Sequence, residues 1–341
     1  MSRLRRVRSA RALPLLGAVL VWWTWTCALH PGPEGFPGVL LSPYAVAPLA
    51  LLVGLLVGRR MADRRALSCW VGPALCVVLY LGVCWSVEPA KAPLSYANAN
   101  AALAVQVLAL CAICGSRSTW AGRWVPTAAA LGCVAVAIAN DSRLGSVVAV
   151  GVLTCALLAL FRPPRRRWPI VVAALASVAG AAYGLWWLVT LALRPSWSRL
   201  IADPIRWRLW HDALALWDRN PRLGSGPGSF ARFSPLAADP DTSSAHSLLM
   251  QVGAETGWVG LALLSAIWLG GLVLAASGPA RVAMPAVAAW TALAGHALFD
   301  HLVDFPPVMM AAGMVLGCAA WTSRRSHPDS PADLPNRTRR A

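Results

Sequence analysis

Long apolar runs separated by short polar segments dominate the pattern along the chain. A transmembrane helix needs about 20 mainly apolar residues to cross roughly 30 Å of hydrocarbon. Ten segments meet this requirement, at residues 12–29, 38–58, 67–86, 95–114, 124–140, 144–161, 168–192, 255–276, 282–303 and 306–322. The runs at 124–140 and 306–322 are the shortest of them. The pattern therefore predicts an all-α integral membrane protein with about ten transmembrane helices.

One long stretch, residues 194–250, is too polar to enter a bilayer and forms one large loop. Within it, Asp203-Pro204 is a helix start, because an acidic N-cap precedes a proline at the first helical position. Asn220-Pro221 predicts the end of that helix. Its apolar positions are spaced at helical intervals and form one stripe: Trp207, Trp210, Leu214 and Trp217. A tryptophan-rich amphipathic helix of this kind is predicted to lie in the membrane interface.

Composition and charge agree with a membrane protein. The chain has 341 residues, of which 57% are apolar and 13% charged, and its net charge is +16. Ten crossings place 21 of the 30 basic residues on one side with 3 of the 14 acids, so that side is cytoplasmic. The excess charge is topological, and no nucleic-acid partner is implied. The nine cysteines all lie in apolar runs, and we expect no disulfide framework.

The predicted organisation follows from this topology. It comprises a cytoplasmic basic N-terminus at 1–11, seven transmembrane helices over 12–193, an extracytoplasmic loop at 194–250, three transmembrane helices over 251–322, and a disordered cytoplasmic tail at 323–341. We expect an uncleaved first helix rather than a signal peptide, because its run continues to Leu29 without a small-residue cleavage site.

Arginines at the outward boundary are candidates for anion binding. Arg143 follows Asp141-Ser142 in the hairpin between the fifth and sixth predicted spans, and Arg206 and Arg208 lie in the first turn of the loop helix. Guanidinium groups bind phosphate oxygens in bidentate fashion, which suits the diphosphate of a lipid carrier. The alternative for each arginine is interfacial anchoring, with Arg143 paired to Asp141.

A glycine cluster, a histidine and a buried acid follow in the chain. Gly224, Gly226 and Gly228 predict a tight turn, but the segment lacks the lysine of a phosphate-binding loop. His246 comes just before an apolar helix, where a neutral imidazole can act as a general base. Glu255 lies in an apolar setting, which is a functional hint for an ionisable residue.

These pieces resemble the bacterial O-antigen ligase and polymerase family over roughly residues 140–260. His246-Ser247, followed nine residues later by Gly257-Trp258-Val259-Gly260, is similar to its histidine and Gly-x-x-Gly signature. Three further motifs occur in the family's order: Asp141-Ser142-Arg143, Arg206 with Trp210, and the glycine turn from Asn220 to Phe230.

The resemblance implies a type-C glycosyltransferase-like membrane fold with a large extracytoplasmic loop. It implies that a glycan moves from a polyprenyl-diphosphate carrier, such as undecaprenyl diphosphate, to a glycan, lipid or wall acceptor outside the cytoplasmic membrane. No cofactor or metal is implied. His246 would be the base, and Arg143 and Arg206, with Arg208, would hold the diphosphate. Family members commonly have about twelve spans, two more than predicted here, and Arg143 is followed by leucine where glycine is usual.

A second polar cluster lies near the outer end of the ninth predicted span, at His296, Asp300, His301 and Asp304. These residues are either a hydrogen-bonded polar end of a cavity or ligands of a metal, although metal sites usually fix three or four ligands. The alternative function for the whole chain is a transporter or flippase of lipid-linked glycans. That alternative predicts charged residues in the middle of the spans, where this sequence has almost none.

Overall fold

The computed structural model describes residues 12–29, 42–63, 65–85, 93–118, 123–162, 164–191, 195–200 and 203–322. These residues form helices joined by turns and loops, and no strand occurs among them. The N-terminus predicted at 1–11 and the tail predicted at 323–341 lie outside the described residues.

The ten predicted apolar segments each correspond to a helix. They are α2 (Leu13–Ala28), α4 (Pro43–Asp63), α5 (Arg65–Trp85), α6 (Ala97–Arg117), α7 (Trp124–Ala139), α8 (Arg143–Phe161), α9 (Trp168–Thr190), α12 (Leu248–Ala276), α13 (Ala280–Ala297) and α14 (Pro306–Trp321). Among the described residues, α4, α6, α8, α9 and α12 are long and apolar enough to cross a membrane, and the other five are not counted by that criterion.

The span predicted at 282–303 is wrong at its end. Helix α13 stops at Ala297, and the chain then forms a turn and the short 3-10 helix η6 (Leu302–Asp304). The polar residues Asp300, His301 and Asp304 fall in this segment, where the backbone can leave the helical path and place them at the end of the bundle.

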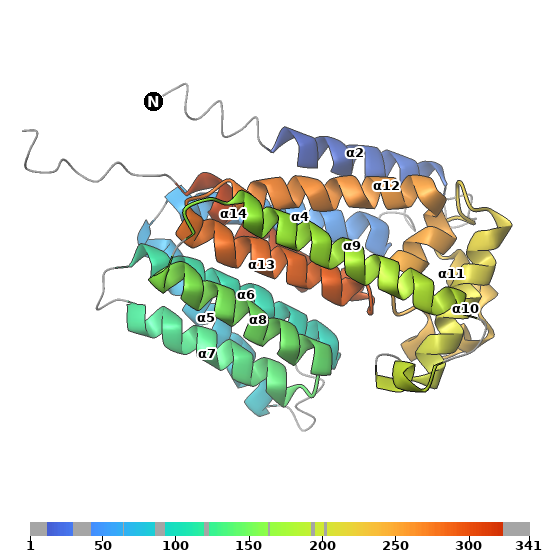
Figure 1. Cartoon of the computed structure of the whole chain (residues 1–341), viewed down its shortest axis with the longest axis horizontal. Helices are drawn as coiled ribbons and strands as arrows, with labels where there is room; N and C mark the ends of the chain where they lie inside the picture. Colours follow the sequence, from blue (N-terminus) through green and yellow to red (C-terminus); the bar gives the residue numbers. More distant parts are fainter. Residues whose placement is uncertain are drawn as a thin grey trace, which may run out of the picture.

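Helices from opposite ends of the chain form the closest pair in the bundle. Helix α4 packs most extensively against α14, and α12 packs against both α2 and α13 (Figure 1). A Cβ atom at Gly54 would overlap the backbone of Met310, and one at Gly313 would overlap that of Leu51. Small residues at four-residue spacing allow such close approach of membrane helices.

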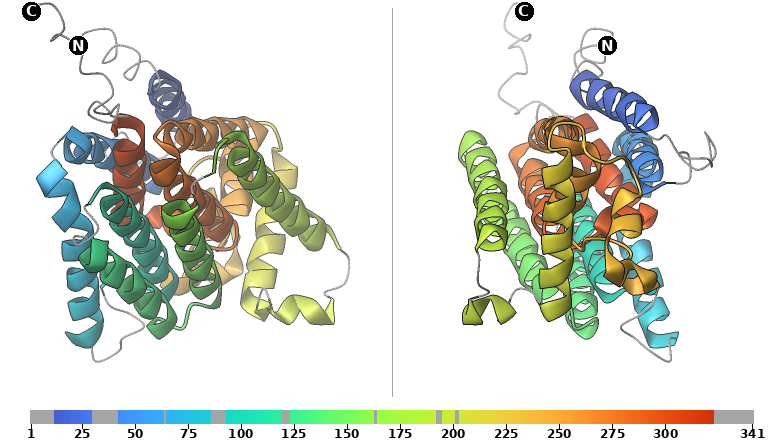
Figure 2. Two further views of the ribbon diagram at one scale, coloured as in Figure 1. Left: turned by 60° about the vertical axis from the view of Figure 1, so that its left-hand side comes forward. Right: turned by 90° about the vertical axis from the view of Figure 1, so that its right-hand side faces the viewer.

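The polar loop folds over one end of the helix bundle (Figure 2). Its elements are η3 (Ser196–Leu200), α10 (Pro204–Arg219), α11 (Ser229–Phe233), η4 (Pro235–Ala238) and η5 (Pro240–Thr242). Both ends predicted for α10 are confirmed. The Asp203 side chain accepts a hydrogen bond from the Arg206 backbone N–H at 2.8 Å, and the helix ends before Asn220.

The α10 apolar stripe packs against protein, and its predicted location in the membrane interface stays a prediction. Trp210 and Trp217 are fully buried, and the helix packs on α12. The Trp217 ring centroid lies 5.2 Å from that of Trp186 and 4.7 Å from that of Trp258. The Trp210 and Trp217 part of the stripe therefore faces protein, whereas Trp207 and Leu214 are half-buried.

Candidate active site

The two glycine motifs meet in one backbone junction between the loop and α12. Gly224 has a φ of +73° and Gly257 a φ of +65°, in the left-handed region that favours glycine. A Cβ atom on Gly224 would overlap the backbone of Glu255 and Thr256, and one on Gly257 would overlap that of Arg222. Each motif therefore needs glycine because the backbone of the other motif occupies the space of a side chain.

Glu255 holds this junction from the α12 side. Its buried carboxylate accepts a hydrogen bond from the Tyr44 hydroxyl at 2.5 Å and another from the Phe230 backbone N–H at 3.1 Å. Backbone hydrogen bonds run from Ser225 N to Ala254 O (3.0 Å), from Gly226 N to Glu255 O (2.9 Å) and from Trp258 N to Pro221 O (3.0 Å). The functional hint at Glu255 thus corresponds to a positioning role between α4, α12 and the loop.

His246 is brought into a cluster of polar side chains just before α12. It is buried and has a φ of +47°, a backbone conformation that residues other than glycine rarely adopt. Such strain persists only where the surroundings hold it in place, and it often marks functional sites. Its Nε2 atom lies 2.7 Å from the Asp241 carbonyl oxygen, and its Nδ1 atom lies 3.5 Å from the Tyr96 hydroxyl.

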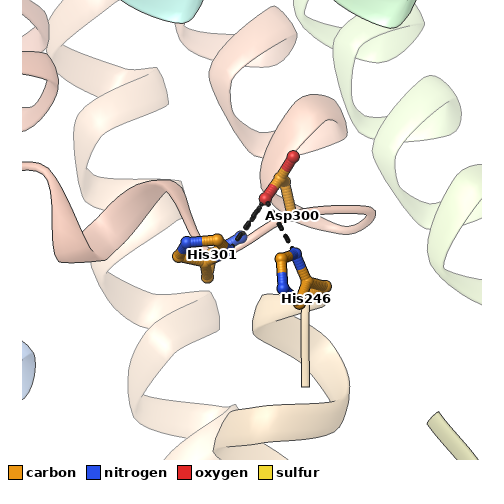
Figure 3. Close-up of side chains that lie close together, drawn as sticks. All are labelled: His246, Asp300 and His301. Carbon is orange, nitrogen blue, oxygen red and sulfur yellow. Dashed lines mark hydrogen bonds and ion pairs between the residues drawn. The ribbon is translucent and has the colours of Figure 1, made fainter. Parts of the chain in front are cut away.

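Asp300 is the centre of this cluster (Figure 3). Its Oδ1 atom lies 3.7 Å from Nδ1 of His246 and 3.0 Å from Nδ1 of His301, so two histidines share one carboxylate oxygen. The rings of these histidines are nearly perpendicular, at 84°, with centroids 4.4 Å apart.

The other oxygen of Asp300 faces the loop helix and the start of α6. The Asn98 amide donates to Oδ2 at 2.5 Å, and an Arg206 guanidinium nitrogen lies 3.5 Å from the same atom. Arg206 also donates to the Phe299 carbonyl oxygen at 2.8 Å and to the Tyr96 hydroxyl at 3.2 Å. The Tyr96 hydroxyl donates to Asp300 Oδ1 at 2.8 Å. Segments far apart in sequence therefore meet at one carboxylate.

Ser142 connects the hairpin motif to the same centre, whereas Arg143 does not touch it. The buried Ser142 side chain caps α8 and donates to Asn98 Oδ1 at 2.6 Å. Arg143 begins α8 with an exposed side chain, and within the described residues it makes no ion pair with Asp141. The predicted Asp141 pairing is therefore absent, and the Arg143 guanidinium remains available at the edge of the site.

Other residues singled out in the sequence have different positions. Arg208 is exposed on α10 and does not share the contacts of Arg206. Trp210 packs against Phe299, with ring centroids 6.3 Å apart, and supports the segment that carries Asp300. Gly228 begins α11 with a φ of +73°, and Gly260 lies against the Thr256 side chain.

His211 and His296 lie outside the cluster. His211 packs against Trp207 with ring centroids 4.7 Å apart and the rings tilted by 45°, and burial lowers its pKa. His296 is buried in α13, and neither ring nitrogen has a hydrogen-bond partner among the described residues. The predicted four-residue cluster is thus divided, because His296 is set apart from Asp300, His301 and Asp304.

Charge stabilisation sets the protonation state of the centre. Burial alone would raise the pKa of Asp300, but His246, His301 and the charge of Arg206 hold it well below its usual range. Burial, together with the Asp300 carboxylate, raises the pKa of Tyr96, so this hydroxyl stays protonated and donates. Asp300 is therefore an anion that can stabilise a positive charge on either histidine.

A cavity of about 300 Å³ opens beside the cluster, between α2, α4, α12 and η6. Its apolar wall includes Trp22 and Leu51, and its polar wall includes Glu255, His301 and Asp304. A second cavity, of about 180 Å³ and almost wholly apolar, lies between α9, α12 and α13. The two cavities share lining residues of α12 and of the segment 303–309, so they lie next to each other beside the polar cluster.

The same cluster contains the donor atoms of a possible cation site. His246, Asp300 and His301 offer ligand atoms within 4.8 Å of one another. The guanidinium of Arg206 already lies 3.5 Å from Asp300, and His246 Nε2 is directed at a carbonyl. This donor set suits an Arg-Asp-His hydrogen-bonding network better than a divalent metal, which would be repelled by the adjacent guanidinium.

Sequence reasoning missed the roles of Tyr96 and Asn98, and it gave Asp300 no place beside His246. The available signal was the polar pattern Tyr96-x-Asn98-x-Asn100 at the start of an otherwise apolar span. Polar residues in such a position usually face the interior of a bundle.

Comparison with known proteins agrees with the motifs. The sequence model of a family described as O-Antigen ligase matches residues 127–265. No curated protein matches the chain. The family match includes Ser142, Arg206 and His246 and relates the chain to glycosyltransferase-type enzymes of surface polysaccharide biosynthesis. Together with the apolar helices, it identifies a multi-pass membrane protein.

Proposed function

We propose that the chain, whose residues 127–265 match the O-Antigen ligase family model, transfers a glycan from a polyprenyl-diphosphate carrier to an acceptor hydroxyl at the outer face of the cytoplasmic membrane. The loop over residues 194–250 then faces outward, and both termini are cytoplasmic, as the distribution of arginines predicts. The polyprenyl chain occupies apolar space at the end of the bundle, and the diphosphate meets the arginines above it.

The arginines serve the leaving group. Two guanidinium nitrogens of Arg206 donate hydrogen bonds to Phe299 and Tyr96, which fixes the plane of the guanidinium group. Its further N–H groups remain free to bind phosphate. Arg143 and Arg208 are exposed and supply additional positive charge. A fixed positive charge stabilises the diphosphate as it departs, and this kind of preorganised electrostatic term is usually large in catalysis.

A base beside Asp300 serves the acceptor. The motif assigns this role to His246, which lies with His301 on the same carboxylate oxygen. A positioned base of this kind contributes about 10²–10⁴-fold to the rate. Neither a metal nor a cofactor is required for this step.

The observation that carries the proposal is the meeting of Arg206 and His246 on opposite oxygens of Asp300. Arg206 and the two histidines on the opposite oxygen, one of which is the base, are thereby held on one carboxylate, as required when one bond forms while another breaks. A flippase has no need for a base and an anion-binding group fixed on one carboxylate.

The test is glycan transfer by the purified full-length protein in proteoliposomes. The donor is an undecaprenyl-diphosphate-linked glycan, the acceptor is the membrane glycolipid fraction of the producing cell, and released undecaprenyl diphosphate is measured. We expect Arg206→Ala and His246→Ala to lose turnover, whereas Arg219→Ala, which removes the same charge from the far end of α10, keeps it.

Full transfer by His246→Ala would remove the mechanism. Donor glycan that crosses the liposome membrane without any transfer would favour the flippase alternative.

A further inference from the structure

The two histidines on Asp300 present different nitrogens to their surroundings. The Asp241 carbonyl oxygen can only accept a hydrogen bond, so the His246 Nε2 atom, 2.7 Å away, carries a hydrogen and donates it. The remaining nitrogen of His246, Nδ1, faces the Tyr96 hydroxyl and Asp300. Both nitrogens of His246 are therefore directed at protein groups, and His246 does not line the cavity of about 300 Å³.

His301 has the opposite arrangement. Its Nδ1 atom lies 3.0 Å from Asp300 Oδ1, and its other ring nitrogen points away from Asp300 (Figure 3). His301 lines the cavity, and within the described part of the chain no residue forms a hydrogen bond with its Nε2 atom. The contact between Nδ1 and Asp300 is an ion-pair contact without the geometry of a hydrogen bond, but the nearby negative charge favours the tautomer with hydrogen on Nδ1, which leaves a lone pair on Nε2.

Phe305 and Tyr96 hold the His301 ring in this orientation. The ring centroid of His301 lies 4.8 Å from that of Tyr96 and 5.6 Å from that of Phe305, and Tyr96 and Phe305 stack with an interplanar angle of 6°. The His301 backbone N–H also donates to Asp300 Oδ1 at 2.8 Å. The imidazole is thus held by aromatic contacts, by the backbone hydrogen bond to Asp300 and by the close approach of Nδ1 to the same carboxylate.

We propose that the acceptor hydroxyl binds in the cavity between α4 and α12, that His301 Nε2 is the base that receives its proton, and that His246 is a positioning residue that packs edge-on against the His301 ring and is itself fixed by its hydrogen bond to Asp241. This inference rests on the proposed glycan transfer and identifies the residue that faces the acceptor. It differs from the motif, which points to His246 for the base.

The reaction step balances as follows. The acceptor oxygen forms a bond to the anomeric carbon of the glycan while the bond from that carbon to the diphosphate oxygen breaks. The diphosphate leaves with the electron pair toward Arg206. The hydroxyl proton passes to His301 Nε2, where Asp300 stabilises the imidazolium, and it is then released to solvent.

Charged and titratable groups surround His301 from several elements. Asp300 and Asp304 flank it in sequence, His246 approaches from the start of α12, Tyr96 from the start of α6, and Glu255 lines the same cavity. Burial raises the pKa of Asp304, so Asp300 is the carboxylate whose negative charge is best maintained beside the imidazole.

The experiment compares His301→Gln with His246→Gln in the proteoliposome assay across a range of pH. Glutamine keeps a polar group of similar reach but takes up no proton. The wild-type kcat/KM is expected to fall about tenfold per pH unit on the acid side, as the base becomes protonated. In His301→Gln we expect a rate lower by about 10²–10⁴-fold and no fall of kcat/KM on the acid side, which we call the acid limb. His246→Gln should slow the reaction but keep the acid limb.

Two controls make the result decisive. Binding of undecaprenyl diphosphate and the thermal unfolding midpoint should match wild type in His301→Gln, and His301→Asn replaces this variant if it does not fold. An acid limb that persists in either His301 variant, or a rate within threefold of wild type, overturns the assignment. Loss of the limb only in His246→Gln returns the base role to His246. A wild-type protein that releases no undecaprenyl diphosphate at any pH refutes the proposed function itself.

Discussion

Replacement of Gly224 by alanine should destabilise the protein at the junction between the two glycine motifs. The φ of +73° disfavours any residue with a Cβ atom by about 1–2 kcal/mol. The added methyl group would also overlap the backbone of Glu255 and Thr256, which no side-chain rotation can relieve. The loop must then shift and lose the hydrogen bonds from Ser225 to Ala254 and from Gly226 to Glu255, worth about 0.5–1.5 kcal/mol each. We expect a total loss of about 2–5 kcal/mol.

Gly228 provides the matched control for this prediction. It has the same φ of +73°, but a Cβ atom there would meet only the flexible end of Arg232, at 3.6 Å. Gly228→Ala should therefore cost only the backbone strain, about 1–2 kcal/mol.

The assay is denaturant-induced unfolding of the purified protein in detergent micelles, followed by tryptophan fluorescence. Trp217 and Trp258 lie at the junction and report on it. Equal destabilisation by the two substitutions would refute the argument that the motifs require glycine because their backbones touch.

Four further predictions follow from the site and its support. Asp300→Asn should lower stability at neutral pH by about 2–3 kcal/mol, less than for a fully buried pair because Arg206 is partly exposed. Because the pKa of Asp300 is lowered on folding, its carboxylate contributes stability that is fully present above the unfolded pKa of about 3.9 and is lost as the pH falls through the folded pKa. The free energy of unfolding of Asp300→Asn, measured against pH, should not show this loss on the acid side. Arg206→Ala should weaken equilibrium binding of undecaprenyl diphosphate at least tenfold more than Arg208→Ala. Equal effects would contradict the role of the fixed orientation of the Arg206 guanidinium group. Chelation with EDTA should leave transfer unchanged, whereas a loss that a divalent cation restores would establish a metal at the cluster. Trp217→Ala should destabilise the protein by about 3–5 kcal/mol because the ring is buried, whereas Trp197→Ala, at a ring that is 46% exposed, should change unfolding little.

Local pattern was sufficient to place the helices. The apolar runs gave all ten helix positions, and Asp203 and Asn220 marked the ends of α10, because span length and helix capping depend on neighbouring residues only. The turn at Asp300 was missed because the apolar run extends past Ala297, and hydropathy alone does not show where a backbone leaves the helix.

Contacts between distant segments could not be predicted in this way. The Tyr96–Asp300 hydrogen bond joins residues 204 positions apart, and the Tyr44–Glu255 hydrogen bond joins residues 211 apart. Arg206 and His246 were recognised as candidates for chemistry from their motifs, but their shared carboxylate depends on how α6, α10, α12 and α13 pack. The contacts of the α10 stripe with α9 and α12 could not be predicted for the same reason.

The α4–α14 pair sets a constraint on how the protein is made. Gly54 meets Met310, 256 positions later in the chain, so the glycine face of α4 must wait in the membrane while nearly all of the protein is synthesised. At about 5–20 residues per second, this interval lasts roughly 13–50 s. Helix α14 follows directly after the turn with Asp300 and His301. These two site residues therefore leave the ribosome shortly before the helix that completes the bundle. A chain cut short before Asp300 therefore lacks both the central carboxylate and the closing helix, so truncation there cannot leave a complete bundle without an active site.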